Sequence, residues 1–167
     1  MRRTKRYPVE GSNSLWQLYK TVSFFKVARN FAVLQTARYT PFFSVKNWMY
    51  RRLLGMNVGE KTAFALMVMP DTLYPEMIKV GRNTIIGYNS TILAHEYLVE
   101  EYRLGEVVIG DNVMIGANST VLPGVVIGDG AVISAATLVH RDVPAGAFAG
   151  GNPMQIIKMP EQKEQKD

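Results

Sequence analysis

The 167-residue chain has the length of one domain, and its lack of cysteine excludes disulfides and cysteine-based metal sites. Its net charge of +5 is unevenly distributed. Residues 1–55 hold 11 Lys or Arg and one acid, whereas residues 56–167 hold 8 Lys or Arg and 13 Asp or Glu. The basic character therefore belongs to the N-terminal segment.

The first residues are basic, but they lead into Glu10-Gly-Ser-Asn rather than an apolar run, so we predict no signal peptide. Lys20, Lys26 and Arg29 interrupt the most apolar stretch, which argues against a membrane-spanning helix. The absence of cysteine fits a reducing compartment. These features together predict a cytoplasmic location.

Residues 1–55 are predicted to form a basic helical segment. Ser14 and Gln17 fit a capping box for a helix from Leu15 to Arg38, which ends before Pro41. Ser44 is the expected cap of a second helix over 45–54, and Gly55 follows its end.

The first predicted helix is apolar around its whole girth, which indicates more than one partner. The interpretation we favour is packing on the rest of the chain and on a neighbouring subunit, with the basic residues solvated. The alternative is association with an anionic membrane surface or a lipid-linked substrate, because Lys, Arg and aromatic residues interleave here. No nucleic-acid-binding motif accompanies the charge, so no such partner is predicted.

Residues 56–158 are dominated by a repeat of six residues. A β-branched residue returns at this spacing in two series: Val80, Ile86, Ile92; and Ile109, Ile115, Val121, Ile127, Ile133, Val139. This period is neither helical nor that of a simple strand, and it is typical of a solenoid whose stacked coils bury one apolar column. An antiparallel sandwich would instead need strands of irregular length with two-residue alternation.

The slot three residues after each anchor predicts the corners of the coil. It holds residues that tolerate positive φ, namely Asn83, Asn89, Asn112, Asn118, Gly124 and Gly130. Each unit is therefore expected to be a short strand ending in a tight turn.

The repeat breaks after Ile92. A polar insertion, Val99–Glu106, moves the following anchors out of register, and a solenoid accommodates such an insertion as a loop that often carries function. His95 stands at the base of this loop, in the slot that Asn or Gly fills elsewhere. One interpretation is therefore a corner histidine that only tolerates positive φ. The one we favour is a catalytic group.

The sequence resembles the hexapeptide-repeat acyltransferases over about residues 56–158, in the runs 80–95 and 109–158 with their D-V-P and G-N-P turns. Within that superfamily it is most similar to the maltose, galactoside and nodulation-type O-acetyltransferases. The resemblance implies a left-handed parallel β-helix, three repeats per coil, a homotrimer and acetyl-CoA as co-substrate. It also implies transfer of an acetyl group to a hydroxyl or amine of a sugar-like or cell-envelope acceptor.

By this resemblance His95 is the general base, since an imidazole ordinarily titrates near neutral pH. Such a base needs an orienting partner, and the sequence leaves four candidates open: Asp71, Glu96, Glu100 and Glu101. Tyr97, Tyr102 and Arg103, with Asp71 and Glu96, are candidates for the acceptor site. The asparagine by which sugar-acetylating relatives contact their acceptor has no counterpart in residues 64–71, so the sequence leaves the acceptor open.

The resemblance also places the acyl-CoA site in a groove between subunits. The matching positions are Ala117, Ala135, His140, Arg141 and Lys158. The two alanines would let the pantetheine arm approach the backbone, and the basic residues would meet the phosphates. His140 replaces a usual threonine, and Gln155 stands where a basic residue is common, which weakens the expected phosphate contacts.

Two other functions are weighed against this one. Some trimeric left-handed β-helices are zinc carbonic anhydrases, but their site needs three histidines and this chain has two, so no metal is predicted. A non-catalytic trimeric scaffold or membrane-surface interaction protein would use the same coil without acetyl-CoA. Residues 159–167 are polar, are expected to be a mobile tail, and receive no role.

Overall fold

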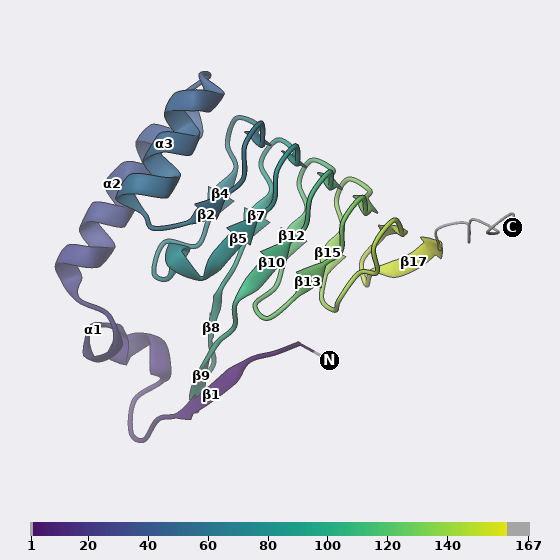
Figure 1. Cartoon of the computed structure of the whole chain (residues 1–167). Helices are drawn as coiled ribbons and strands as arrows, with labels where there is room; N and C mark the ends of the chain where they lie inside the picture. Colours follow the sequence, from purple (N-terminus) through teal and green to yellow (C-terminus); the bar gives the residue numbers. More distant parts are fainter. Residues whose placement is uncertain (1, 160–167) are drawn as a thin grey trace, which may run out of the picture.

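The computed structural model describes residues 2–159, so the predicted tail lies outside the described part except for Met159. The chain begins with strand β1 (Lys5–Pro8), the 3-10 turn η1 (Ser14–Gln17) and the helices α1 (Leu18–Thr21), α2 (Phe24–Tyr39) and α3 (Phe43–Leu53). Short strands then follow one another to residue 158, and Figure 1 shows most of them as successive turns of one coil, with the strands over residues 95–104 running off it.

Each full turn of the coil contributes three strands. The first is β2 (Asn57–Val58), β3 (Ala63–Phe64) and β4 (Met69–Pro70); after η2 (Pro75–Met77), the second is β5 (Ile78–Val80), β6 (Ile85–Ile86) and β7 (Thr91–Ile92). The third is β10 (Val107–Ile109), β11 (Met114–Ile115) and β12 (Thr120–Val121), and the fourth is β13 (Val126–Ile127), β14 (Val132–Ile133) and β15 (Leu138–Val139). The chain ends with β16 (Phe148–Gly150) and β17 (Gln155–Lys158).

The strands stack into three sheets that form the sides of the coil. Their orders are β13-β10-β5-β2, β17-β16-β14-β11-β6-β3 and β15-β12-β7-β4. Pairing is parallel from coil to coil, with each anchor opposite the next, as in Ile92–Val121–Val139. The predicted β-helix with three repeats per coil is the fold of residues 57–150.

The apolar anchors form the core, as the repeat predicts. All nine have 2% or less of their surface exposed. The six residues predicted to adopt positive φ all do so, with φ between 52° and 77°. Ala136 takes the same conformation at φ 56°, although alanine gives no sequence signal for it.

The anchors and corners of the first coil were not recognised from the sequence. Its anchors Val58, Phe64 and Pro70 keep the six-residue spacing, and two of its corners, Lys61 and Met67, have positive φ without being Asn or Gly. Because these residue types are unusual for the repeat, the pattern becomes recognisable only from Val80 onward.

The predicted loop at residues 99–106 is an antiparallel hairpin that begins earlier, at His95. Strand β8 (His95–Tyr97) pairs with β9 (Glu101–Leu104), and the N-terminal strand β1 adds to the other edge of β9. The sequence pattern predicts helices over 15–38 and 45–54 but does not identify β1, whose partner is a distant segment that no local pattern could reveal.

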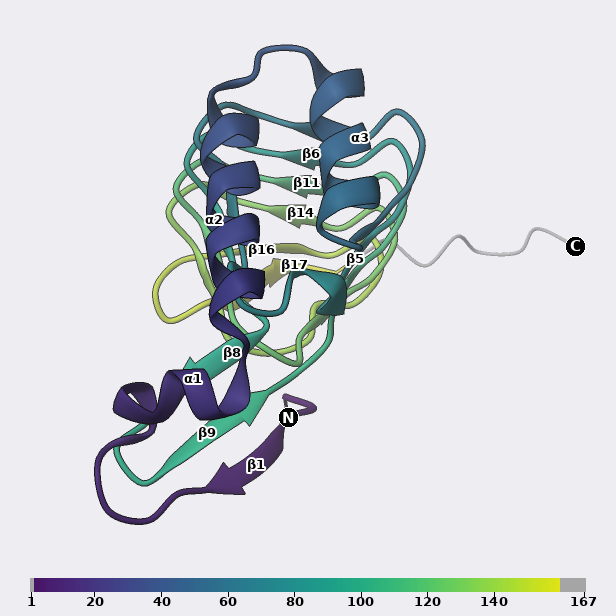
Figure 2. The ribbon, with the colours of Figure 1, turned by 90° about the vertical axis from the view of Figure 1, so that its left-hand side faces the viewer.

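The helices α2 and α3 cover the open end of the coil at its first turn, as Figure 2 shows in a view onto that end. Helix α3 contacts β2 and β3, and α2 contacts β4. Polar side chains of α3 bind carbonyls of this edge: Lys46 Nζ donates to Phe64 O and Ala65 O at 3.0 Å, and Asn47 Nδ2 donates to Thr62 O at 2.7 Å. These contacts blunt a sheet edge that could otherwise pair with another chain.

The helices differ from the prediction in three respects. The expected helix over 15–38 is interrupted at Val22 and Ser23, which have extended ψ, so that buried Val22 separates α1 from α2. Asn13 caps η1, because the Ser14 hydroxyl donates to Leu98 O of the hairpin instead. Helix α3 begins at Phe43 without a side-chain cap, so Ser44 is not its N-cap.

The close stacking of coils predicts a large stability loss for Gly116→Ala. A Cβ at Gly116 would lie 2.7 Å from Ala135 Cα, and backbone atoms there cannot move aside as a flexible side chain could. We expect the free energy of unfolding to fall by about 3 kcal/mol in denaturant titrations, at the upper end of overpacking effects. The control is Gly130→Ala, whose Cβ would meet only one atom, at 4.0 Å, so that its cost comes from the left-handed φ of 67° alone. An equal loss of unfolding free energy in both variants would contradict the stacking argument.

Candidate active site

The site is built where two successive coils turn the same corner. Asp71 follows β4 directly, and His95 begins β8 just after β7, the strand that pairs with β4. The His95 Nδ1 atom lies 2.6 Å from Asp71 Oδ2. The Asp71 side chain is fully buried, whereas that of His95 is 20% exposed. Of the four candidate partners of His95, the structure brings Asp71 into contact with it.

The backbone holds Asp71 in place. Its Oδ1 atom accepts hydrogen bonds from Leu73 N and Tyr74 N at 2.8 and 2.9 Å, and its Oδ2 atom accepts from Ala94 N and His95 N at 2.7 and 3.1 Å. Burial alone raises the pKa of Asp71, but the hydrogen bond and charge of His95 and the N–H groups of Tyr74 and Ala94 outweigh it, so this pKa lies below its ordinary value. Asp71 is therefore ionised at neutral pH.

The charge of Asp71 decides which nitrogen of His95 carries the proton. An ionised carboxylate only accepts hydrogen bonds, so Nδ1 must donate to it. In a neutral imidazole the other nitrogen, Nε2, then keeps its lone pair. This is the arrangement of a base that an adjacent carboxylate orients.

His95 is also not a left-handed corner residue. Its backbone belongs to β8, and it is not among the residues with positive φ in the described part of the chain. The interpretation of His95 as a mere turn residue is therefore wrong, because the hairpin replaces the expected corner.

Aromatic rings flank His95 and continue along the hairpin. Tyr74 and Tyr97 lie with ring centroids 6.1 and 5.4 Å from the imidazole. Tyr102 stacks between Tyr97 and Tyr7 of β1, at 5.5 and 4.7 Å. Burial raises the pKa of both Tyr74 and Tyr102, which keeps these phenols neutral. Sequence reasoning selected Tyr97 and Tyr102 but missed Tyr7 and Tyr74, which lie far from His95 in the chain.

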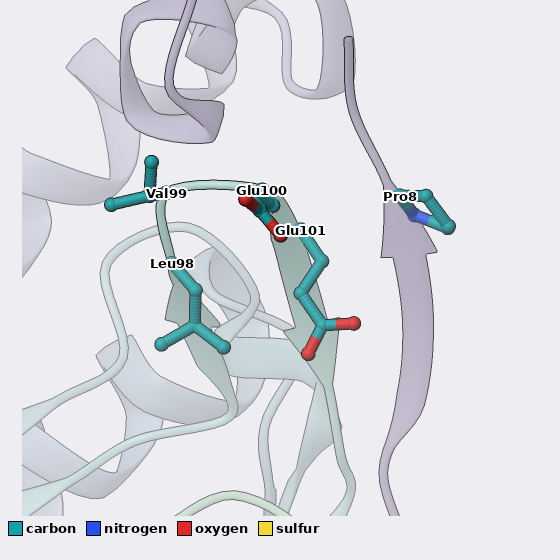
Figure 3. A pocket seen from close by; sticks show the side chains of 5 residues that line it. All are labelled: Pro8, Leu98, Val99, Glu100 and Glu101. Carbon is teal, nitrogen blue, oxygen red and sulfur yellow. The ribbon is translucent and has the colours of Figure 1, made fainter.

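The charged candidates on the hairpin are engaged in ion pairs. Glu96 accepts a hydrogen bond from Arg2 at 2.8 Å, and Arg103 is paired with Glu101. Glu100 and Glu101, with Pro8, Leu98 and Val99, line a hollow of about 430 Å³ near the tip of the hairpin (Figure 3). His95 does not line this hollow, so the structure separates these carboxylates from the imidazole.

The residues expected to bind CoA fall into separate places. Ala117 and Ala135 stack at the corner between β11–β14 and β12–β15, where Ala136 N donates to Ala117 O at 2.8 Å. His140 and Arg141 lie at the next corner, in the same column as His95 but two coils further along. Lys158 is on β17, at the far end of the coil. Within a single chain, these five residues therefore do not form one site.

No cluster of three or more metal-ligating side chains occurs among residues 2–159. Within these residues, the ring contacts of His95 that the structure shows are with Asp71, Tyr74 and Tyr97.

Comparison with known proteins identifies the family. The family model of the bacterial transferase hexapeptide (six repeats) matches residues 106–141. A Bacillus subtilis (strain 168) protein named "Putative acetyltransferase YvoF" is 66% identical over 166 residues, which cover 99% of this chain and 96% of that protein. The chain belongs to the hexapeptide-repeat acetyltransferase family.

Solved hexapeptide-repeat structures share the fold and confirm a left-handed β-helix. A Vibrio cholerae acetyltransferase of this type, in complex with acetyl coenzyme A, matches with a TM-score of 0.68 at 21% identity, over 80% of this chain and 86% of that one. A maltose O-acetyltransferase from Clostridium difficile 630 matches with a TM-score of 0.66 at 23% identity, over 84% and 90%. A galactoside acetyltransferase in complex with coenzyme A gives 0.61 at 24%, over 80% of each chain. The expected likeness to maltose and galactoside acetyltransferases is thereby confirmed.

Proposed function

We propose that this protein transfers an acetyl group from acetyl-CoA to a hydroxyl group of a sugar-like or cell-envelope acceptor, with an amine as the alternative nucleophile. The observation that carries the proposal is the contact of His95 Nδ1 with the buried Asp71 carboxylate at 2.6 Å. The family and its acetyl-CoA-bound and CoA-bound structural neighbours support the choice of co-substrate.

In the proposed reaction, His95 Nε2 takes the proton from the acceptor hydroxyl while its oxygen attacks the thioester carbonyl of acetyl-CoA. The tetrahedral intermediate then collapses, the carbon–sulfur bond breaks, and the CoA thiolate receives the proton from the imidazolium. Asp71 stabilises the imidazolium and holds its orientation, as a carboxylate does in triads of this kind. Tyr74 and Tyr97 flank the imidazole and would shape the acceptor site.

We further propose a homotrimer in which the CoA site lies between subunits. Ala117 and Ala135 lie on one corner of the coil, and His140 and Arg141 lie on another. A groove between adjacent copies would bring the two alanines of one subunit near the His95 corner of the next. Small side chains at positions 117 and 135 leave the backbone open to a pantetheine arm, and Arg141 and Lys158 would meet phosphate groups.

Ligand-dependent thermal unfolding tests this proposal. Because a ligand bound only to the folded state stabilises it, acetyl-CoA at about 100 times its Kd should add about 2.7 kcal/mol to the free energy of unfolding. Ala117→Trp should abolish the shift by filling the expected path of the pantetheine arm, whereas Ala145→Trp, at a third corner, should keep it. An unshifted melting temperature with both CoA and acetyl-CoA would favour a non-catalytic scaffold instead.

A further inference from the structure

One end of the molecule presents large aromatic and basic side chains that the fold leaves uncovered. This aromatic–basic face lies on α2, α3 and the loop between them, and it consists of Phe25, Arg29, Tyr39, Phe42, Trp48 and Arg52. Phe25 is 82% exposed, Phe42 68%, Tyr39 63% and Trp48 54%. So much exposed aromatic surface on one element pair is typical of an interaction site.

Helical periodicity turns this face away from the coil. In α2, Asn30, Leu34 and Ala37 are buried, and Phe25 and Tyr39 lie on the opposite side of the helix. In α3, Lys46, Asn47, Met49 and Tyr50 are buried, and Trp48 lies opposite them. Figure 2 shows α2 and α3 lying over the end of the coil. Since their buried sides face the coil, the aromatic–basic face on their opposite sides points away from it.

The helices that carry this face have charged side chains of one sign, and the neighbouring acid Glu76 pairs with Lys26 of α2. Residues 11–59 contain seven Lys or Arg and no Asp or Glu. Lys46 is buried, whereas Lys20, Arg29, Arg51 and Arg52 are exposed. Two copies meeting end to end would place like charges together, which opposes self-association through this face. The complementary partner is therefore anionic, and it must also accept aromatic side chains.

We propose that the aromatic–basic face docks on an anionic lipid bilayer. Aromatic rings prefer the interfacial region of a bilayer, and exposed Lys and Arg are attracted by anionic headgroups. Within residues 2–159 none of the helices could cross a bilayer, so the contact is peripheral, with the apolar side chains inserted at headgroup level.

This docking would place His95 close to the membrane surface. The hydroxyl of Thr21, on α1, lies 2.7 Å from Tyr97 OH, and Lys26 Nζ of α2 lies 4.9 Å from the ring centroid of Tyr74. Both tyrosines flank His95. An acceptor anchored in the bilayer would then be within reach of the base, a consequence that rests on the proposed function, whereas the docking itself does not.

Vesicle flotation tests the docking without any need for activity. We expect the wild-type protein to float with vesicles of phosphatidylcholine and phosphatidylglycerol, and to stay in solution with phosphatidylcholine alone. The double variant Phe25→Ser/Trp48→Ser should lower the partition coefficient at least about tenfold because it removes two inserted rings. Arg52→Glu should lower it about fivefold or more, and added salt should weaken binding of the wild type.

A matched control removes exposed apolar side chains from the opposite end of the coil. Ile157→Ser/Met159→Ser changes residues that are 59% and 55% exposed, and it should float like the wild type. Thermal unfolding of every variant separates loss of binding from loss of folding. Failure of the wild type to float at low salt would overturn the proposal. So would equal flotation with both vesicle types, or binding to a single-stranded oligonucleotide without binding to vesicles.

Discussion

His95→Gln is expected to lower the turnover of acetyl-CoA by about 10²- to 10⁴-fold, the range that a positioned general base contributes. Glutamine can keep a hydrogen bond to the carboxylate of Asp71, but it has no basic nitrogen to accept the proton of the acceptor. The measurement is the rate of CoA thiol release with a panel of sugars, amino sugars and lipid-linked glycans, using whichever acceptor the wild type acetylates. The KM for acetyl-CoA should change little, because the variant leaves the proposed CoA positions intact.

The second histidine of the chain provides the control. His140 lies at the same corner as His95 but two coils away, and its Nδ1 atom is 3.3 Å from its neighbour Leu138 O rather than from a carboxylate. His140→Gln should therefore act on the KM for acetyl-CoA and spare kcat. If His95→Gln kept most of the wild-type kcat, or if the two variants lost turnover equally, His95 would not be the base.

The regular part of the fold was predictable from the sequence because each six-residue repeat carries its own anchor and corner residues. From Ile109 to Val139 a β-branched anchor recurs every six residues, and Asn or Gly marks the turns. Strands, corners and core therefore follow from local residue types. Coil one was missed because Pro70, Lys61 and Met67 occupy anchor and corner positions without the usual residue types. The strand β1 was missed because its stability depends on pairing with β9, nearly a hundred residues away.

The site was predictable only in part, because it too depends on contacts between segments that are distant in the sequence. The break in the repeat located His95, and resemblance gave its expected role. The partner of His95 had to be chosen among Asp71, Glu96, Glu100 and Glu101. That choice depends on the stacking of the first coil on the second, and the first coil was not recognised. Asp71 is adjacent to His95 because β4 stacks on β7, so the sequence distance of 24 residues carries no signal of contact.

Asp71→Asn is expected to lower kcat about 100-fold or more while leaving the KM for acetyl-CoA nearly unchanged. An asparagine amide can donate a hydrogen bond to His95 Nδ1, which would favour the tautomer with its proton on Nε2 and so block the base. The same substitution in a serine-protease triad acts through the wrong tautomer in this way. Asp71→Glu keeps the charge and should retain more activity than Asp71→Asn, so a reversed order would contradict a positioning role.

The pH dependence of stability tests whether the ionised carboxylate of Asp71 also stabilises the fold. Its pKa in the folded protein lies below the ordinary value of about 3.9, so the unfolded chain binds the proton first as the pH falls. The stabilisation by ionised Asp71 is thus complete well above pH 3.9 and is lost as the pH drops through the folded-state pKa. Asp71→Asn lacks this contribution, so denaturant titrations should show the wild type more stable at pH 7 and the difference narrowing below about pH 4. If the difference stayed constant over that range while kcat still fell, the carboxylate charge would not be what stabilises the fold at this corner.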